Sequence, residues 1–157
     1  MQKITPFLWF DTQAEEAARF YCSVFKNSKI TDISRYEPGS PRPAGTAMSV
    51  TFTLDGQEFM ALNGGPEFKF TEAISLFVHC ETQAEVDELW TKLTAGGEEV
   101  QCGWLKDKYG LSWQIVPEGL GECLGGPDAN GSRRAMQAML QMKKLDIGKL
   151  RQAYNGT

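Results

Sequence analysis

Hydrophobic and polar positions follow two different periods along the chain, and the order of these periods occurs twice. Short apolar segments at residues 4–10 and 74–80 have the length and the branched or aromatic content of β-strands. After each of them, apolar residues recur at helical spacing, which predicts an amphipathic helix. The apolar positions are Ala14, Ala17, Tyr21, Val24 and Phe25 in the first helix and Val86, Leu89, Trp90 and Leu93 in the second. Each half of the chain therefore begins with a strand and a helix.

The two predicted helices also begin with nearly the same sequence. Residues 11–15 read Asp-Thr-Gln-Ala-Glu, and residues 81–85, which lie 70 positions later, read Glu-Thr-Gln-Ala-Glu. Thr12 and Thr82 each begin a capping box, in which a Thr and a Glu side chain satisfy backbone N–H groups at a helix start. A repeated unit usually cannot bury its hydrophobic face alone, so the two copies are expected to share one core.

Each predicted helix is followed by a strand-rich segment. The expected strands are residues 29–37, 46–54 and 57–62 in the first half, and residues 99–106 and 111–116 in the second. Asp55-Gly56 predicts a two-residue hairpin, and residues 107–110 form the matching turn. The proline-rich residues 37–45 predict a loop. Each half therefore has the order βαβββ, and the fold class is α+β.

A further segment at residues 132–154 predicts one or two helices outside the repeat. Its apolar residues, with basic residues between them, are Met136, Met139, Leu140 and Leu145. These helices must dock on this subunit or on another one. The expected organisation is one domain over residues 1–130, with repeats at about 1–65 and 71–118, and a helical extension at 131–157.

The amino-acid composition indicates the number of domains and argues against membrane and nucleic-acid partners. A chain of 157 residues with 41% hydrophobic and 23% charged residues can form one well-buried domain. We expect a cytoplasmic protein without a membrane partner, because the first residues do not resemble a signal peptide and no apolar run has membrane-spanning length. A net charge of −4 and a pI of about 5.1 argue against a nucleic-acid partner, which needs concentrated Lys and Arg.

Two side chains with reactive chemistry are isolated in the sequence. His79 is the single histidine, and its ordinary pKa suits a general base, but no acidic or nucleophilic partner is evident. A hydrogen-bonded or surface role is therefore favoured. The four cysteines are scattered, which is typical of reduced thiols rather than of disulfides or a zinc site. Cys102, beside Gly103, is interpreted as a small buried hydrophobe, because nothing indicates a lowered thiol pKa.

Five segments carry a resemblance to a known family. They resemble the PhnB-like branch of the vicinal oxygen chelate superfamily, a branch often labelled 3-demethylubiquinone-9 3-methyltransferase. The superfamily includes glyoxalase I, bleomycin-resistance proteins and extradiol dioxygenases. The segments are residues 4–11, 14–21, 61–66, 68–75 and 102–107. The resemblance implies that each half is a curved sheet with its helix on the convex face, and that the two halves enclose a concave pocket.

Metal-using members of the superfamily place four ligands, usually His, Glu or Gln, on the first and last strand of each half. The last-strand positions correspond to Met60 and Gln114. The first-strand candidates are Ile4, Thr5 and Pro6 in one half and Ala73, Ile74, Ser75 and Leu76 in the other. Of the four expected positions only that of Gln114 has a suitable side chain, and a divalent metal needs several such ligands. No metal and no cofactor is therefore expected.

The same alternation predicts a pocket. Gln114 and Ser112 should share one face of their strand, and the repeat places Met60 on the corresponding face of the other half. Trp104 and Phe70 add aromatic surface, which suits a planar ligand. The predicted ligand-binding residues are Met60, Phe70, Trp104, Ser112 and Gln114. The alternative is that these side chains simply fill the interior of the domain.

Three functions stay open at this point. The first is metal-independent binding of an aromatic or quinone-like small molecule in the pocket between the repeats. The second is catalysis on the same fold, as a methyltransferase by the family label or as an isomerase or dioxygenase-like enzyme. The third is a dimeric interaction module without a ligand. A homodimer is expected in each case, because symmetric dimers are the commonest closed assembly. The sequence indicates no catalytic residue.

Overall fold

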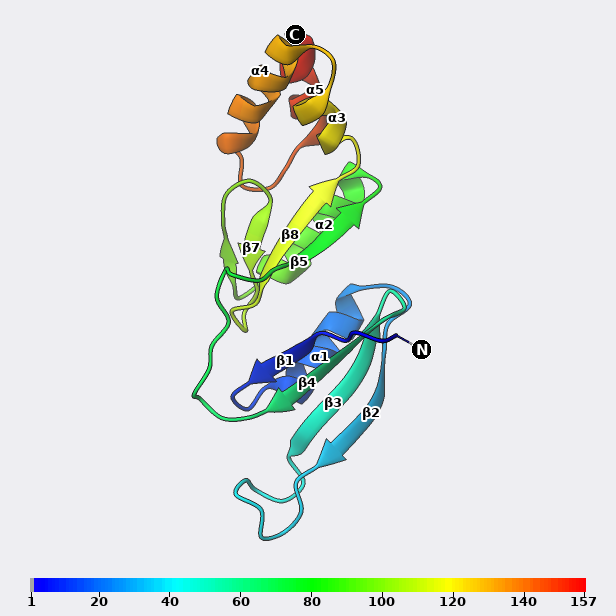
Figure 1. Cartoon of the computed structure of the whole chain (residues 1–157), viewed down its shortest axis with the longest axis vertical. Coiled ribbons are helices and arrows are strands. Elements are labelled where there is room, and N and C mark those ends of the chain that lie inside the picture. Colours follow the sequence, from blue (N-terminus) through cyan, green and yellow to red (C-terminus); the bar gives the residue numbers. More distant parts are fainter. Residues whose placement is uncertain (1) are drawn as a thin grey trace. The chain divides into compact units, whose positions relative to one another are not determined.

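The computed structural model describes residues 2–157 and divides the chain into two compact units, Met1–Phe70 and Thr71–Thr157 (Figure 1). The first unit has the predicted βαβββ order. Its elements are β1 (Phe7–Phe10), α1 (Ala14–Val24), β2 (Lys29–Arg35), β3 (Ala47–Leu54) and β4 (Gln57–Asn63). The sheet order is β1-β4-β3-β2, in which β1 runs parallel to β4 and the other pairs are antiparallel.

The second unit repeats this order and then adds helices. Its elements are β5 (Leu76–Cys80), α2 (Gln83–Thr94), β6 (Glu98–Glu99), β7 (Trp104–Lys106), β8 (Ser112–Pro117), α3 (Leu120–Gly125), α4 (Ala129–Leu140) and α5 (Ile147–Asn155). The sheet order β5-β8-β7-β6 matches that of the first unit, which confirms the α+β fold. The sequence predicted α4 and α5 but not the short α3.

The predicted strand at residues 99–106 is interrupted. Cys102 and Gly103 have positive φ angles of 59° and 84°, so the chain turns between β6 and β7. Both backbone N–H groups of this turn donate to the C-terminal segment, Cys102 to the carbonyl of Met142 and Gly103 to that of Lys143, each at 2.8 Å. The turn is therefore hydrogen-bonded to a segment that lies about forty residues further along the chain.

The registers of the two parallel strand pairs confirm the repeat. Phe7 lies opposite Met60 in the β1–β4 pair, and Phe77 lies opposite Gln114 in the β5–β8 pair. Phe77 follows Phe7 by the same 70 residues that separate the repeated helix starts. Met60 and Gln114 therefore occupy matching positions in the two sheets.

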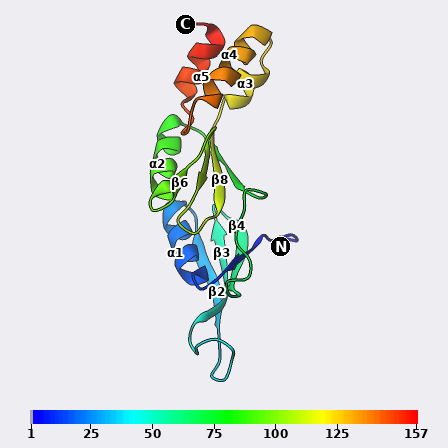
Figure 2. The same ribbon diagram turned by 90° about the vertical axis from the view of Figure 1, so that its left-hand side faces the viewer.

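Each sheet is covered by its own helix on one face (Figure 2). In the first unit, buried residues of α1 such as Tyr21 pack with alternate residues of the sheet such as Phe52. In the second, Trp90 and Leu93 of α2 and Trp113 of β8 are similarly buried. Successive side chains of a strand point to opposite faces, so the intervening residues form a second face, which we call the open face of each sheet.

Only one of the two capping boxes forms as predicted. At the start of α2, Thr82 accepts a hydrogen bond from the Glu85 N–H at 3.2 Å, and Glu85 accepts one from the Glu81 N–H at 3.3 Å. At the start of α1 the prediction for Thr12 is wrong, because Gln13 is the N-cap residue and makes no capping bond with its side chain.

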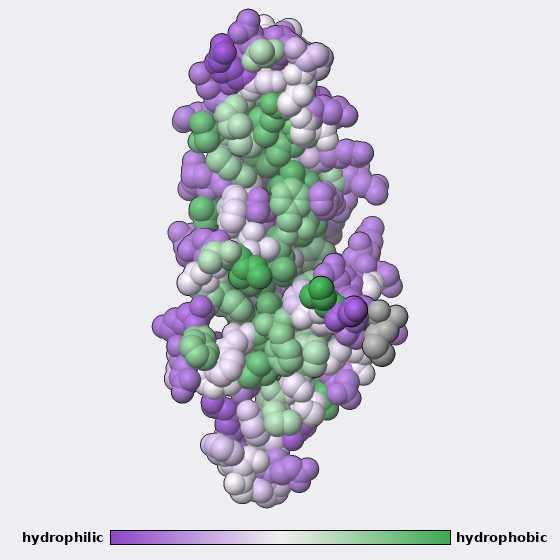
Figure 3. Space-filling view, in the orientation of Figure 1, coloured by the Kyte–Doolittle hydropathy of each residue, from purple (hydrophilic) through white to green (hydrophobic). Residues whose placement is uncertain are grey.

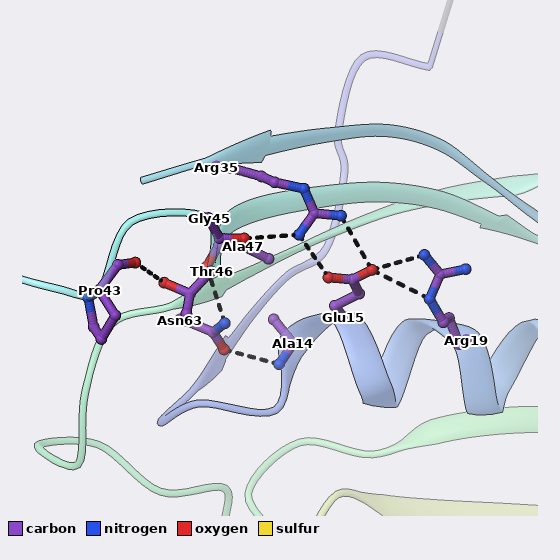
Figure 4. A network of polar contacts seen from close by, with 9 residues as sticks. All are labelled: Ala14, Glu15, Arg19, Arg35, Pro43, Gly45, Thr46, Ala47 and Asn63. Carbon is purple, nitrogen blue, oxygen red and sulfur yellow. Dashed lines mark hydrogen bonds and ion pairs between the residues drawn. The ribbon is translucent and has the colours of Figure 1, made fainter. Parts of the chain in front are cut away.

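A buried side chain from β4 takes the place of the missing cap. Asn63, which is 5% exposed, accepts a hydrogen bond from the Ala14 N–H at 2.8 Å and donates one to the Ala47 carbonyl at 3.0 Å (Figure 4). The helix start is thus joined to two strands of its own sheet.

Glu15 does not cap the helix and instead links α1, β2 and the loop that ends at Gly45. Its carboxylate accepts hydrogen bonds from Arg35 on β2 at 2.9 Å and from Arg19 on α1 at 2.7 Å (Figure 4). Arg35 also donates to the carbonyl of Gly45, at the end of the predicted loop, at 3.1 Å. The hydrogen bonds from Arg35, and then those from Arg19, hold the pKa of Glu15 below its ordinary value.

Glu15→Gln is expected to lower the free energy of unfolding at pH 7 by about 0.5–1 kcal/mol, the range for partly exposed ion pairs. Because the pKa of Glu15 is lower in the folded state, its contribution is present above the unfolded pKa and is lost as the pH falls through the folded pKa. Urea unfolding at pH 7 and pH 3 should therefore show a larger difference at pH 7 than at pH 3. The exposed Glu16→Gln is the control, and an equal loss at both pH values would contradict this explanation.

The three C-terminal helices belong to the second unit, where they pack around a core of their own and dock on α2 and the turn after β6. The buried residues of this core are Cys123, Ala135, Ile147 and Leu150. The amide of Gln83, at the start of α2, donates to the Leu145 carbonyl at 2.9 Å and accepts from the Ile147 N–H at 2.9 Å. Lys144 and Asp87 add an ion pair at 2.8 Å. The extension therefore docks on this subunit, which answers the question that the sequence left open.

Within residues 2–157, none of the helices has the length and apolar character that a membrane span requires.

Candidate functional site

The open face of the second sheet brings three of the predicted binding residues together. Trp104 on β7 lies opposite Gln114 on β8, and Lys106 lies opposite Ser112. Phe77 on β5 is the neighbour of Gln114 on its other side. Residues that are opposite one another in adjacent strands share a face, so an aromatic ring, an amide, a hydroxyl and an ammonium group adjoin here. Figure 3 shows apolar side chains gathered over the strands of both units.

The Gln114 amide is held in place by a neighbour. Its Nε2 donates a hydrogen bond at 2.9 Å to the Ser75 Oγ, in the segment that precedes β5. Gln114 is half-buried, so this contact fixes the orientation of a side chain that a ligand could still reach. In the first unit the position that matches Ser75 is Thr5, whose hydroxyl donates instead to Glu58 at 3.3 Å.

Ser112 is the least satisfied residue of this face. It is 1% exposed, and its hydroxyl has no hydrogen-bond partner within residues 2–157. A buried hydroxyl without a partner costs about 1–3 kcal/mol. Strand alternation turns this hydroxyl to the same face as Gln114. The sequence predicted the face of Ser112 but could not show that the hydroxyl would be left without a partner.

Lys106, the strand neighbour of Ser112, forms an ion pair with Glu72, which lies just before β5. The side chain of Lys106 is 35% exposed and that of Glu72 is 56% exposed. The hydrogen bond between them lowers the pKa of Glu72 and raises the pKa of Lys106. Sequence reasoning missed this pair, because 34 residues separate its members and neither lies in a motif with a known role.

The other two predicted binding residues belong to the first unit. Met60 lies on the open face of that sheet, between Phe7 on β1 and Thr51 on β3. Phe70 packs edge-on against Phe10, with 5.2 Å between the ring centroids, and Phe10 is a buried residue of the helix-covered face. That all five predicted residues line one pocket stays a prediction.

A shallow hollow of about 470 Å³ lies where the parallel strands β5 and β8 end. It is lined by His79, Cys80, Glu81, Val116, Pro117 and Glu118. His79 is exposed and its ring contacts that of Phe77, with 4.7 Å between centroids. Burial, and then the charge of Glu85, raise the pKa of the Cys80 thiol to about 12, so this cysteine is not a nucleophile at neutral pH.

The positions at which the resemblance implied metal ligands do not fit a metal ion. Met60 offers a thioether, and the hydroxyl of Ser75 is already the acceptor for the Gln114 amide. This combination lacks the several imidazole, carboxylate or thiolate ligands that hard or borderline divalent metals require. Within residues 2–157, no group of three or more His, Cys, Asp and Glu side chains is arranged to hold a metal ion.

The family model described as 3-demethylubiquinone-9 3-methyltransferase matches residues 2–116 of the chain. The chain belongs to this family. The match ends within β8, so the helices α3, α4 and α5 lie beyond it.

Among the solved structures, a putative 3-demethylubiquinone-9 3-methyltransferase, the PhnB protein from Bacillus cereus, has 45% sequence identity and a TM-score of 0.70. The alignment covers 74% of this chain and 99% of that one. Protein PA1353 from Pseudomonas aeruginosa is 20% identical, with a TM-score of 0.63 and coverage of 75% and 98%, and shows the fold alone. No curated protein sequence matches the chain. About a quarter of this chain therefore has no counterpart in either structure.

Proposed function

We propose that this member of the family binds an aromatic or quinone-like small molecule without a metal, at a site to which the open face of the second sheet contributes. The observation that carries the proposal is the orphan hydroxyl of Ser112 beside Trp104 and Gln114. Small-molecule sites are mostly apolar and contain a few placed polar groups. The open face of the second sheet has this composition.

The description of the family raises methyl transfer as an alternative, and the Bacillus cereus protein is described as a putative methyltransferase of the same kind. The glycine pair of this chain does not favour it. Gly64 and Gly65 follow β4 and lead into the segment between the units rather than into a helix. The indole of Trp9 donates to the Gly65 carbonyl at 3.0 Å, and its ring lies so close to Gly64 that a Cβ at this position would clash with it.

A thermal-shift screen tests the proposed function. Quinones and aromatic acids are expected to raise the unfolding temperature by mass action, whereas S-adenosylmethionine and Zn²⁺, Ni²⁺ or Mn²⁺ are expected to leave it unchanged. A rise with a metal ion alone would overturn metal-independent binding. No rise with any aromatic compound would favour the interaction module, for which the homodimer stays a prediction.

Gln114→Leu is expected to weaken a polar quinone-like ligand by about 1–3 kcal/mol, because the substitution leaves a buried polar group of the ligand without its partner. Folding should survive, since leucine fits a half-buried strand position. Titration calorimetry with the compound that the screen selects measures the effect. The exposed Gln57→Leu on β4 is the control, and an equal loss in both variants would show that Gln114 is not specific to binding.

A further inference from the structure

The open face of the second sheet holds an ion pair directly beside an unsatisfied hydroxyl. Lys106 and Ser112 are opposite one another in the antiparallel pair of β7 and β8. Side chains in such positions have Cβ atoms about 4.5–5.5 Å apart, so a small group that displaces what covers Ser112, which is 1% exposed, would contact both of them. Glu72 supplies a carboxylate to Lys106 but not to the hydroxyl, which has no partner within residues 2–157.

The contact between Glu72 and Lys106 is one that a competitor can replace. Both side chains are more than one-third exposed, and Glu72 comes from a non-strand segment that precedes β5. Exposed ion pairs contribute little to stability, because water screens them and holding two long side chains costs entropy. The Lys106 ammonium would keep a charged partner after the exchange, so replacing Glu72 by another carboxylate costs little.

We infer that Lys106 and Ser112 receive the carboxylate of an aromatic acid, and that Glu72 occupies Lys106 as an internal substitute while the ligand is absent. The inference rests on the proposed function and names its ligand class. A ligand carboxylate can accept hydrogen bonds from both the Lys106 ammonium and the Ser112 hydroxyl. The Glu72 carboxylate satisfies only the first, so the ligand gains a bond that the internal substitute does not make.

The rest of this face suits the planar part of such an acid. Trp104 precedes Lys106 by two residues on β7, so both side chains point to the same face. Trp104 lies opposite Gln114, whose amide is oriented by Ser75. An aromatic ring on Trp104 would place its carboxylate toward Lys106 and its polar substituents toward Gln114. A neutral analogue would contact the same ring but could not displace Glu72.

Titration of the full chain with 2-naphthoate and with the neutral 2-naphthamide tests the inference. The wild type is expected to prefer naphthoate by about tenfold, the effect of one charge-assisted hydrogen bond. Glu72→Gln removes the internal competitor and should raise naphthoate affinity about two- to fivefold, with naphthamide unchanged. Lys106→Met should abolish the preference for the acid.

The ion pair of Glu88 and Lys92 on α2 supplies matched controls. It has a 2.8 Å contact and side chains that are 60% and 44% exposed, but it lies on the helix rather than on the open face. Glu88→Gln and Lys92→Met should change the affinity of neither probe. Ser112→Ala should weaken naphthoate about fivefold or more while leaving the ligand-free protein at least as stable as before, because the lost hydroxyl has no partner to leave behind.

Three outcomes overturn the inference. In the first, naphthoate and naphthamide bind with equal affinity, both to the wild type and to Glu72→Gln. This result would show that there is no carboxylate site, although the protein still binds a small molecule. Absence of naphthoate binding to every variant, when quinones still raise the unfolding temperature, would have the same meaning. If quinones also fail, both the inference and the proposed function are wrong. A stability loss in Ser112→Ala with unchanged naphthoate affinity would assign the hydroxyl a structural role.

Discussion

Asp107→Ala is expected to lower the free energy of unfolding by about 3–5 kcal/mol, because it leaves several buried donors without an acceptor. Asp107 is 3% exposed and begins the turn after β7. Its Oδ1 accepts hydrogen bonds from the N–H groups of Tyr109 at 2.8 Å and Leu111 at 3.1 Å, and its Oδ2 accepts one from the indole of Trp113 at 2.9 Å. Trp113 is 1% exposed, so water cannot replace the lost acceptor.

Chemical unfolding of the purified variants measures this effect. Asp107→Asn is the informative partner, because its amide oxygen can still serve the turn while its NH₂ group faces the Trp113 indole donor. The free energy of unfolding of Asp107→Asn should therefore fall by less than that of Asp107→Ala. Asp55→Ala, in the hairpin of the first unit, is exposed and serves as the control, although its φ of 47° adds a small cost of its own. An Asp107→Ala variant no less stable than Asp55→Ala would contradict the prediction.

Asn63→Ala is expected to lower the free energy of unfolding by about 2–4 kcal/mol, since it removes a helix cap and a second buried hydrogen bond together. The variant leaves the Ala14 N–H and the Ala47 carbonyl without their side-chain partner. Both groups lie at the end of the first sheet, where α1 begins. The loss should therefore be greatest for the first unit.

Hydrogen exchange of the backbone amides, together with urea unfolding, tests the effect of Asn63. Exchange should increase at the start of α1 and leave α2 unchanged. Asn63→Asp keeps an acceptor for Ala14 at a helix N-terminus, where negative charge is favoured, but places it near the Ala47 carbonyl. It should fall between wild type and Ala. If Asn63→Ala exchanges at the start of α1 as slowly as wild type, the capping role of Asn63 is wrong.

Much of the fold could be predicted from the sequence because the chain repeats itself. The repeated start at residues 11–15 and 81–85 predicts two equivalent halves, and the equivalence extends to the register of Met60 and Gln114. The local signal at Thr82 was sufficient for its helix. The same signal at Thr12 failed, because a residue 49 positions from Ala14 supplies the cap. A local pattern cannot reveal a partner that tertiary structure brings from a distant strand.

The candidate site also has some features that could be predicted from the sequence and others that could not. Alternation along β8 predicts that Ser112 and Gln114 share a face, since the strand period is independent of what surrounds the strand. Neither the ion pair of Lys106 with Glu72 nor the isolation of the Ser112 hydroxyl could be predicted. Both depend on where the segment between the halves runs, and that segment has no periodic pattern. The sequence therefore indicated which face of the strand carries Ser112 and Gln114, but only the structure shows that the Ser112 hydroxyl has no hydrogen-bond partner within residues 2–157.

The docking of the C-terminal helices has a consequence for synthesis on the ribosome. The first unit contains all of its own strand partners by residue 70 and can fold while the rest of the chain is still being made. The second cannot do so in the same way. The Gln83 amide and the turn at Cys102 and Gly103 acquire their partners only when residues 142–147 emerge. Until then the nascent chain carries one folded half and one incomplete half, and a premature stop codon after β8 would release it in that state.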